Sequence, residues 1–103
     1  MKEIVFLGDT QSVIREWGID VRKEIGHQLF RIQNGLSPED FKPHKTIGFG
    51  VQELRVKRGK EYRVIYTVKF FDAIYVLNAF IKKTQKTPKH AIDLAKRRLK
   101  EIA

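Results

Sequence analysis

Apolar and polar positions along the first third of the chain predict one strand followed by two helices. Residues 4–7 form a short apolar, β-prone run that a Gly-Asp pair closes. Thr10 or Ser12 is the expected N-cap of a short helix reaching about Trp17. A second helix is expected from the N-cap Asp20 to the next Asn-Gly pair, because four apolar residues recur there at helical spacing. These residues are Val21, Ile25, Leu29 and Ile32.

The central part of the chain predicts three strands in quick succession. Residues 37–50 contain two prolines and two glycines without a clear period, and we expect a basic loop there. The runs 51–57, 62–69 and 73–81 are strand-like. Connections as short as those between them join only antiparallel neighbours. The sequence therefore predicts an antiparallel meander.

A last helix is expected after the meander. Thr87 is a suitable N-cap, and Pro88 suits the first helical position. An apolar stripe follows at Ile92, Ala95, Leu99 and Ile102. The predicted order is β-α-α-β-β-β-α, a small, mostly antiparallel α+β fold in a single domain over residues 1–103.

Alternation along the first two strands of the meander separates apolar from charged side chains. The apolar face is formed by Leu54, Val56, Val64 and Tyr66. The other face carries Glu53, Arg55, Lys57 and Arg63. A three-residue turn at 59–61 would pair Val56 with Val64 and Lys57 with Arg63. Because like charges directly opposite one another destabilise a sheet, the pairing of Lys57 with Arg63 indicates a role other than stability.

The charge of the chain is concentrated in its second part. The net charge is +9, from 21 Lys+Arg and 12 Asp+Glu. Residues 1–41 carry five basic and seven acidic residues, a net of −2, whereas residues 42–103 carry sixteen and five, a net of +11. Such a segment attracts a polyanion, and nucleic acid, an acidic protein and an anionic membrane surface are all candidates at this point.

Several classes of protein are disfavoured by what the sequence lacks. Without cysteine there is no disulfide framework, no cysteine zinc site and no thiol nucleophile, which fits a reducing cytoplasm. No signal peptide or membrane span is recognisable, so we expect a soluble protein that does not contact a membrane. The three histidines lack the spacing of a metal site, and only His44 is a candidate acid/base group. The Gly-Phe-Gly at 48–50 is expected to be a flexible lead-in to a strand.

The meander predicts a cationic cluster at one end of the sheet. The third strand ends in Lys82 and Lys83, and in a meander this end lies beside Arg63 at the start of the middle strand. A phosphate-binding site is one interpretation, and a solvated face that keeps the protein soluble is the other. Additional substrate-binding candidates lie in the basic loop, the hairpin and the segment around the last helix: Lys45, Lys57, Phe80, Lys86 and Lys89.

Such a cluster has the groups needed to cleave RNA without a metal or other cofactor. A base takes the proton of the ribose 2′-hydroxyl, cations stabilise the phosphate, and an acid protonates the leaving oxygen. Arg63 and Arg55 suit the phosphate, because a guanidinium is always charged and binds two oxygens. Glu53 is a candidate base, although it could simply neutralise Arg55. Crowded cations would suit Lys82 and Lys83 to proton transfer by lowering their pKa values.

Seven short motifs extend over nearly the whole chain: Val-Phe-Leu-Gly-Asp at 5–9, Asp-Val-Arg-Lys-Glu-Ile-Gly at 20–26, Lys-Pro-His-Lys at 42–45, Gly-Val-Gln-Glu-Leu-Arg at 50–55, Tyr-Arg-Val-Ile-Tyr at 62–66, Phe-Ile-Lys-Lys-Thr at 80–84 and Thr-Pro-Lys at 87–89. Together they resemble the phage-derived, HigB-like branch of the RelE/ParE toxin superfamily. The resemblance implies helices packed on a small, mostly antiparallel sheet. It also implies a type II toxin that cleaves mRNA on translating ribosomes and is silenced by a cognate antitoxin, often one with a helix-turn-helix domain.

The resemblance also assigns individual residues. Arg63 matches the superfamily arginine of the middle strand, Arg55 the arginine of the Glu-Leu-Arg motif, and Lys83 a basic residue after the last strand. The sequence departs from the pattern at three positions. Asn78 stands where many members of this branch have a histidine, and Glu53 and Val51 stand where the best-known nucleases have lysines.

Two other functions are compatible with the sequence. The ParE branch shares the fold and the Tyr-Arg-x-x-Tyr strand, and its members inhibit DNA gyrase. A basic module that binds RNA or protein without catalysis would have the same charge distribution.

Overall fold

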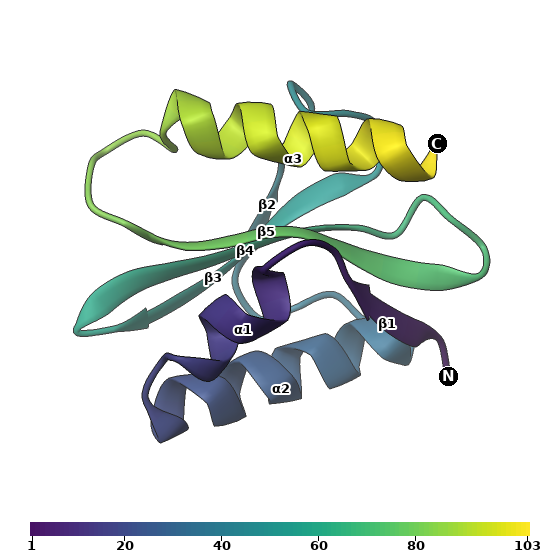
Figure 1. The fold of residues 1–103 in the computed structure, drawn as a ribbon. Coiled ribbons are helices and arrows are strands. Elements are labelled where there is room, and N and C mark those ends of the chain that lie inside the picture. The colour runs from purple at the N-terminus through teal and green to yellow at the C-terminus, as the bar shows by residue number, and fades with distance from the viewer.

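A computed structural model describes all of residues 1–103 and has one five-stranded sheet between two layers of helix (Figure 1). The elements are, in chain order, β1 (Glu3–Phe6), α1 (Thr10–Arg15), α2 (Ile19–Gln33), β2 (Phe41–Pro43), β3 (Val51–Arg58), β4 (Lys60–Thr67), β5 (Ala73–Lys82) and α3 (Lys89–Ile102). The strand order is β1-β5-β4-β3-β2, with β1 parallel to β5 and every other pair antiparallel. Helices α1 and α2 cover one face, and α3 covers the other (Figure 1).

The α+β class and the meander of β3, β4 and β5 are confirmed, but the predicted element order is wrong because it omits β2. This strand lies inside the stretch predicted to be a loop, and Lys42 pairs with Glu53 of β3. Backbone hydrogen bonds flank it, from Arg55 N to Asp40 O at 2.9 Å and from His44 N to Val51 O at 2.9 Å. Three residues are too few to show alternation, and a strand containing proline is tolerated only at a sheet edge, which is where β2 lies.

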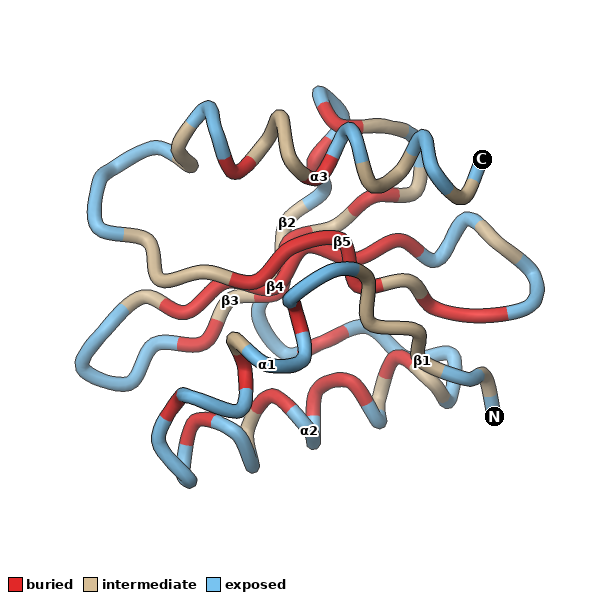
Figure 2. Tube along the Cα trace, in the orientation of Figure 1, coloured by how far each residue is buried: buried red, intermediate tan, exposed pale blue.

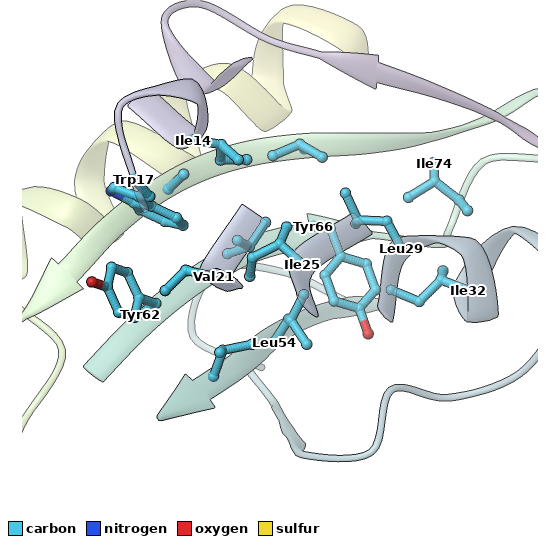
Figure 3. Close-up of a cluster of buried hydrophobic side chains, with 14 residues drawn as sticks. Ile14, Trp17, Val21, Ile25, Leu29, Ile32, Leu54, Tyr62, Tyr66 and Ile74 are labelled. Atoms are coloured by element: carbon cyan, nitrogen blue, oxygen red, sulfur yellow. The ribbon is translucent and has the colours of Figure 1, made fainter. Parts of the chain in front are cut away.

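The larger core lies between the sheet and helices α1 and α2 (Figure 3). All four residues of the α2 stripe are buried there, as are Leu54, Val56, Val64 and Tyr66 of the predicted apolar sheet face. The ring of Trp17 lies 4.9 Å from that of Tyr62, centroid to centroid. The two periodicities in the sequence therefore identified eight of the fourteen buried residues of this core.

The helices begin one to three residues from the predicted caps. Asp9 precedes α1 in place of Thr10 or Ser12, and Gly18 precedes α2, which places Asp20 in the first turn. An acidic residue in the first turn still stabilises the helix through its dipole. The predicted end of α2 is confirmed, since Asn34 is its C-cap and the next residue is a glycine with a φ of 79°. Helix α3 begins after Pro88 instead of after Thr87.

The β3–β4 hairpin has a different register from the predicted one. Leu54 pairs with Val64, and Lys57 pairs with Glu61, so the register differs by two residues. The chain reverses tightly at Gly59, whose φ of 77° suits glycine. Because the shift is even, the predicted faces are unchanged. The like-charge pair is Arg55 with Arg63 in place of Lys57 with Arg63.

A β-bulge in β5 determines which of its side chains lie beside Arg63. Ile65 of β4 pairs with Asn78, whereas the next residue, Tyr66, pairs with Val76. Leu77 is therefore the extra residue, and its carbonyl accepts a hydrogen bond from Arg98 of α3 at 2.9 Å. A bulge exchanges the two faces of the strand beyond it. Phe80 consequently lies opposite Arg63, and Lys82 opposite Glu61.

The smaller core lies between the sheet and α3. It comprises Ile47, Val51, Ile65, Leu77 and Ala95, with Phe80 and most of the predicted stripe of α3 packed against it. Figure 2 shows the buried stretches of β4 and β5 between the two layers of helix. Burial of Ile47 packs the 44–50 loop on α3, and residues 48–50 lead directly into β3, as predicted.

Candidate active site

A polar cleft lies where the β3–β4 hairpin, the end of β5 and the loop leading to α3 meet at one end of the sheet (Figure 1). Its volume is about 570 Å³, and it is lined by Lys57, Glu61, Arg63, Lys82, Lys83, Thr84 and Gln85. Four of these residues are cationic, one is acidic, and none is apolar. The cations come from all three strands of the meander, and the arrangement suits an anion with several oxygens.

Arg63 is buried, and its guanidinium is held from three sides. Nη2 donates to Oε1 of Glu61 at 3.0 Å, Nη1 donates to the carbonyl of Tyr62 at 3.3 Å, and Nε lies 3.2 Å from Oε2 of Glu53. A guanidinium has five N–H groups, so one on each terminal nitrogen remains for a further acceptor. These contacts fix the plane of the group before any ligand binds.

Glu53 is the charged centre of the buried contacts beneath α3. It is 0% exposed, and besides Arg63 it contacts two other residues. Thr87 donates its hydroxyl to Oε1 at 3.1 Å, and Nε2 of His44 lies 3.5 Å from the same oxygen. The hydroxyl predicted to cap α3 therefore binds this carboxylate. Glu53 links β3, β4, the 44–50 loop and the start of α3, and it neutralises Arg63 and not Arg55.

His44 is buried beside Glu53, at the end of β2. Its Nδ1 lies 3.1 Å from the hydroxyl oxygen of Thr46. Burial is the main cause that lowers the pKa of His44, and the positive charges of Lys42 and Lys96 act in the same direction against the opposing effect of Glu53. The ring is therefore neutral at pH 7.

Lys82 and Lys83 line the cleft in different environments. Lys82 is half-buried, and burial, followed by the charges of Arg63 and Lys42, lowers its pKa below the ordinary value of a lysine. Lys83 is exposed. The lowered pKa makes it easier for Lys82 to give up its proton.

The other predicted substrate-binding residues are dispersed. Lys57 lines the cleft, with its Nζ 3.9 Å from Oε2 of Glu61. Phe80 packs against the smaller core, with its backbone opposite Arg63. Lys86 and Lys89 lie outside the cleft lining, and Lys89 pairs with Asp93 at 3.0 Å. Lys45 is exposed on the 44–50 loop and borders separate hollows.

Arg55 also lies outside the cleft lining. Its Nη2 is 2.7 Å from Oδ1 of Asp40, and its Nε donates to the same oxygen at 2.9 Å. Asp40 and Glu53 thus each neutralise one of two arginines that face each other across the hairpin.

Sequence reasoning missed two functional contacts and left one position unexplained. Glu61 was assigned to a turn, although it is the acidic residue of the cleft and binds Arg63. Thr87 was assigned only a capping role. Asn78 donates to the carbonyl of Ala91 at 3.0 Å and accepts from its neighbour's amide, so this side chain fastens β5 to α3. Only the presence of acidic residues within a basic segment could have drawn attention to Glu61.

No group of three or more His, Asp or Glu side chains is arranged to hold a metal ion. None of the three helices has the length and apolar character needed to cross a membrane.

Comparison with known proteins identifies the family. No curated protein matches the chain. The model of a family described as "Phage derived protein Gp49-like (DUF891)" matches residues 12–100, which include the whole cleft lining, Glu53, His44 and Thr87. The chain belongs to this phage-derived, Gp49-like family, which is known as a toxin type of toxin–antitoxin systems.

Proposed function

We propose that this chain is the toxin of a type II toxin–antitoxin pair and a metal-independent endoribonuclease that cuts mRNA on translating ribosomes and so inhibits translation. Membership of a toxin family supports the first part. The observation that carries the second part is the cleft, whose four cations include the fixed guanidinium of Arg63 and Lys82, a lysine of lowered pKa. The resemblance to HigB-like members of the RelE/ParE superfamily points to the same substrate.

In the proposed reaction, neutral Lys82 takes the proton of a ribose 2′-hydroxyl. The 2′-oxygen attacks the adjacent phosphorus, and the bond from phosphorus to the 5′-oxygen breaks. The charge that develops on the phosphate is stabilised by Arg63, which lines the cleft and has two N–H groups that its contacts within the protein do not use. Protonated Lys83 gives its proton to the leaving 5′-oxygen. The products are a 2′,3′-cyclic phosphate and a 5′-hydroxyl, and exchange with water restores both lysines.

Two carboxylates support this chemistry without being bases. Glu53 is completely buried, so we assign it to positioning Arg63 and Thr87. Glu61 occupies Nη2 of Arg63 in the free protein and would compete with phosphate for it. Lys57 is within reach of Glu61 and can bind that carboxylate when RNA displaces it.

The proposed partners are mRNA, the ribosome and a cognate antitoxin. An antitoxin with a helix-turn-helix domain is expected from the HigB-like resemblance. Its simplest way to block the cleft is to place carboxylates against Arg63, as Glu61 already does.

The direct test is to map RNA ends in a translating extract supplied with the wild type or Arg63→Ala. We expect cuts with the wild type and about 10²–10³-fold fewer with the variant, as for loss of one group that stabilises transition-state charge. Arg58→Ala is the matched control, since Arg58 lies in the same hairpin but pairs with Glu24.

Equal cutting by wild type and Arg63→Ala would contradict the proposal, as would the absence of cuts with ribosomes and mRNA present. Arrest of DNA supercoiling without RNA cuts would identify a gyrase inhibitor instead. RNA binding without cuts or growth arrest would identify a non-catalytic module.

A further inference from the structure

Phe49 is an exposed aromatic residue that the proposed cleavage does not use. Its side chain is 86% exposed, on the 44–50 loop immediately before β3. The cleft lies beyond the other end of β3. At about 3.3 Å per residue, an eight-residue strand separates the two places by roughly 20–25 Å. A single exposed phenylalanine is common, so its surroundings decide whether it has a role.

The loop around Phe49 is held in place by buried contacts. Ile47 is buried in the smaller core. Gly48 packs so closely on α3 that a Cβ there would lie 2.7 Å from Cδ2 of Leu99. Gly50 has a φ of 78°, and its carbonyl accepts hydrogen bonds from the Thr67 hydroxyl and the Val68 amide, both at 3.2 Å. The two glycines therefore fix the backbone on either side of Phe49, and the ring is presented to solvent by a fixed loop.

Phe49 borders one of two neighbouring hollows that contain lysines. A hollow of about 480 Å³ is lined by Phe49 with Pro43 and Lys45. A second, of about 450 Å³, shares Pro43 and Lys45 and adds Lys42. Neither hollow has a carboxylate in its lining. Lys42 is also one of the charges that lower the pKa of Lys82, which lines the cleft.

We propose that Phe49 and Lys45 form a subsite for one unpaired nucleobase and its phosphate, in the same single strand of RNA that the cleft cuts. An exposed ring stacks on any base, and a neighbouring lysine neutralises the backbone, which is how proteins bind single strands without reading sequence. Lysines without carboxylates in the lining of both hollows favour nucleic acid over an apolar protein surface. This inference rests on the proposed function, since it takes RNA as the substrate.

The test measures binding of a single-stranded RNA of about 12 nucleotides, within the usual site sizes of ~4–16. Methylation of every 2′-oxygen prevents cleavage, and a terminal dye reports binding by anisotropy. Phe49→Leu should weaken binding about 5- to 150-fold, the range for loss of one stacked base. Phe49→Tyr should bind as the wild type does. Phe71→Leu is the matched control, since Phe71 is 97% exposed on the β4–β5 turn and lines neither hollow.

Salt dependence separates stacking from charge. Phe49→Leu should leave the slope of log affinity against log salt unchanged, whereas Lys45→Ala should reduce it by about 0.7, the value for one phosphate contact of a single strand. The affinity for fully paired RNA of the same length should not change in Phe49→Leu, because the bases of a duplex are already stacked.

The subsite would be overturned if Phe49→Leu bound the single strand as tightly as the wild type, or if Phe49→Leu weakened binding to a protein partner but not to RNA. With either result, loss of cleavage in Arg63→Ala would still support the proposed function. Conversely, if the uncleavable RNA binds through Phe49 but no variant or wild type cuts RNA, the cleavage proposal fails and the subsite remains.

Discussion

The two faces of the sheet are both covered by helix, but they bury different kinds of residue. Beneath α1 and α2, fourteen apolar side chains form one cluster. Beneath α3 the cluster has only five, and Glu53, Arg63 and Asn78 are buried nearby. Burial of polar groups is costly unless partners are supplied. Asn78 is hydrogen-bonded, whereas Nε of Arg63 and Oε2 of Glu53 lie 3.2 Å apart as an ion pair without a hydrogen bond. The first face therefore serves stability, and the second gives up apolar contacts to hold the groups that shape the cleft.

Leu54 and Glu53 show the contrast at neighbouring positions. Both are 0% exposed in β3, and alternation sends their side chains to opposite faces. Leu54 packs in the larger core, whereas Glu53 contacts Arg63, His44 and Thr87. Variants at these two positions separate loss of stability from loss of function.

The largest effect is expected from Lys82→Arg. Arginine keeps the positive charge but does not lose a proton near neutral pH, so cleavage should fall by about 10²–10⁴-fold, the usual contribution of a general base. Because the neutral form of Lys82 is the active one, the wild-type rate should rise with pH toward the lowered pKa of Lys82. Single-turnover cleavage measured across pH tests both statements, and a variant that cuts at the wild-type rate would remove Lys82 from the mechanism.

A second prediction compares Glu53→Gln with Leu54→Ala. The glutamine variant leaves Arg63 short of one counter-charge and should destabilise the fold by about 3–5 kcal/mol, and Leu54→Ala should cost about 2–5 kcal/mol. Chemical denaturation gives both values. Per folded molecule, only Glu53→Gln should also lose cleavage, because only it releases the guanidinium. If both variants cut RNA equally well, Glu53 contributes to stability alone.

The third prediction concerns acid stability on the α3 face. Since burial lowers the pKa of His44, the unfolded chain binds its proton first as the pH falls below about 6.5. Stability from the neutral ring is thus complete above that pH and is lost as the pH falls through the lowered pKa. His44→Gln should abolish this loss, and urea unfolding at pH about 5 and 7.5 measures it. His27→Gln is the control, because His27 is exposed, and this variant should lose stability at acid pH as the wild type does.

The smallest effect is expected from Arg55→Ala. Arg55 pairs with Asp40 at the sheet edge and is 35% exposed, and such pairs contribute about 0–1 kcal/mol. Cleavage should stay near the wild-type rate. A loss comparable to that of Arg63→Ala would place Arg55 in the site after all and would remove the distinction between the two facing arginines.

Local patterns in the sequence predicted much of this molecule. The helical stripe of α2 and the apolar face of β3 and β4 depend on neighbours a few residues away, and they were correct. The predicted meander also placed Lys82 near Arg63, and both residues line the cleft. These features need only periodicity and short connections.

The remaining features depend on contacts between distant segments. Thr87 reaches Glu53 across 34 positions in sequence, and that carboxylate competes with the helix backbone for the hydroxyl. The bulge at Leu77 is stabilised by Arg98, which lies 21 positions further on. The local sequence is compatible with a Thr87 hydroxyl that caps α3 and with a β5 strand that has no bulge. Tertiary contacts determine the conformations that are observed. Contacts between distant segments also determine how far each site residue is buried. Alternation along β3 therefore did not reveal that Glu53 is completely buried.

The most direct test of the central claim is the chemistry of the RNA ends left on a reporter mRNA in a translating extract. Attack by the 2′-hydroxyl within the cleft predicts a 2′,3′-cyclic phosphate upstream of each cut and a 5′-hydroxyl downstream. Both ends should become about 10²–10³-fold rarer when Arg63→Ala replaces the wild type. Cuts that leave a 3′-hydroxyl and a 5′-phosphate, or cuts that are unaffected by Arg63→Ala, would contradict the account.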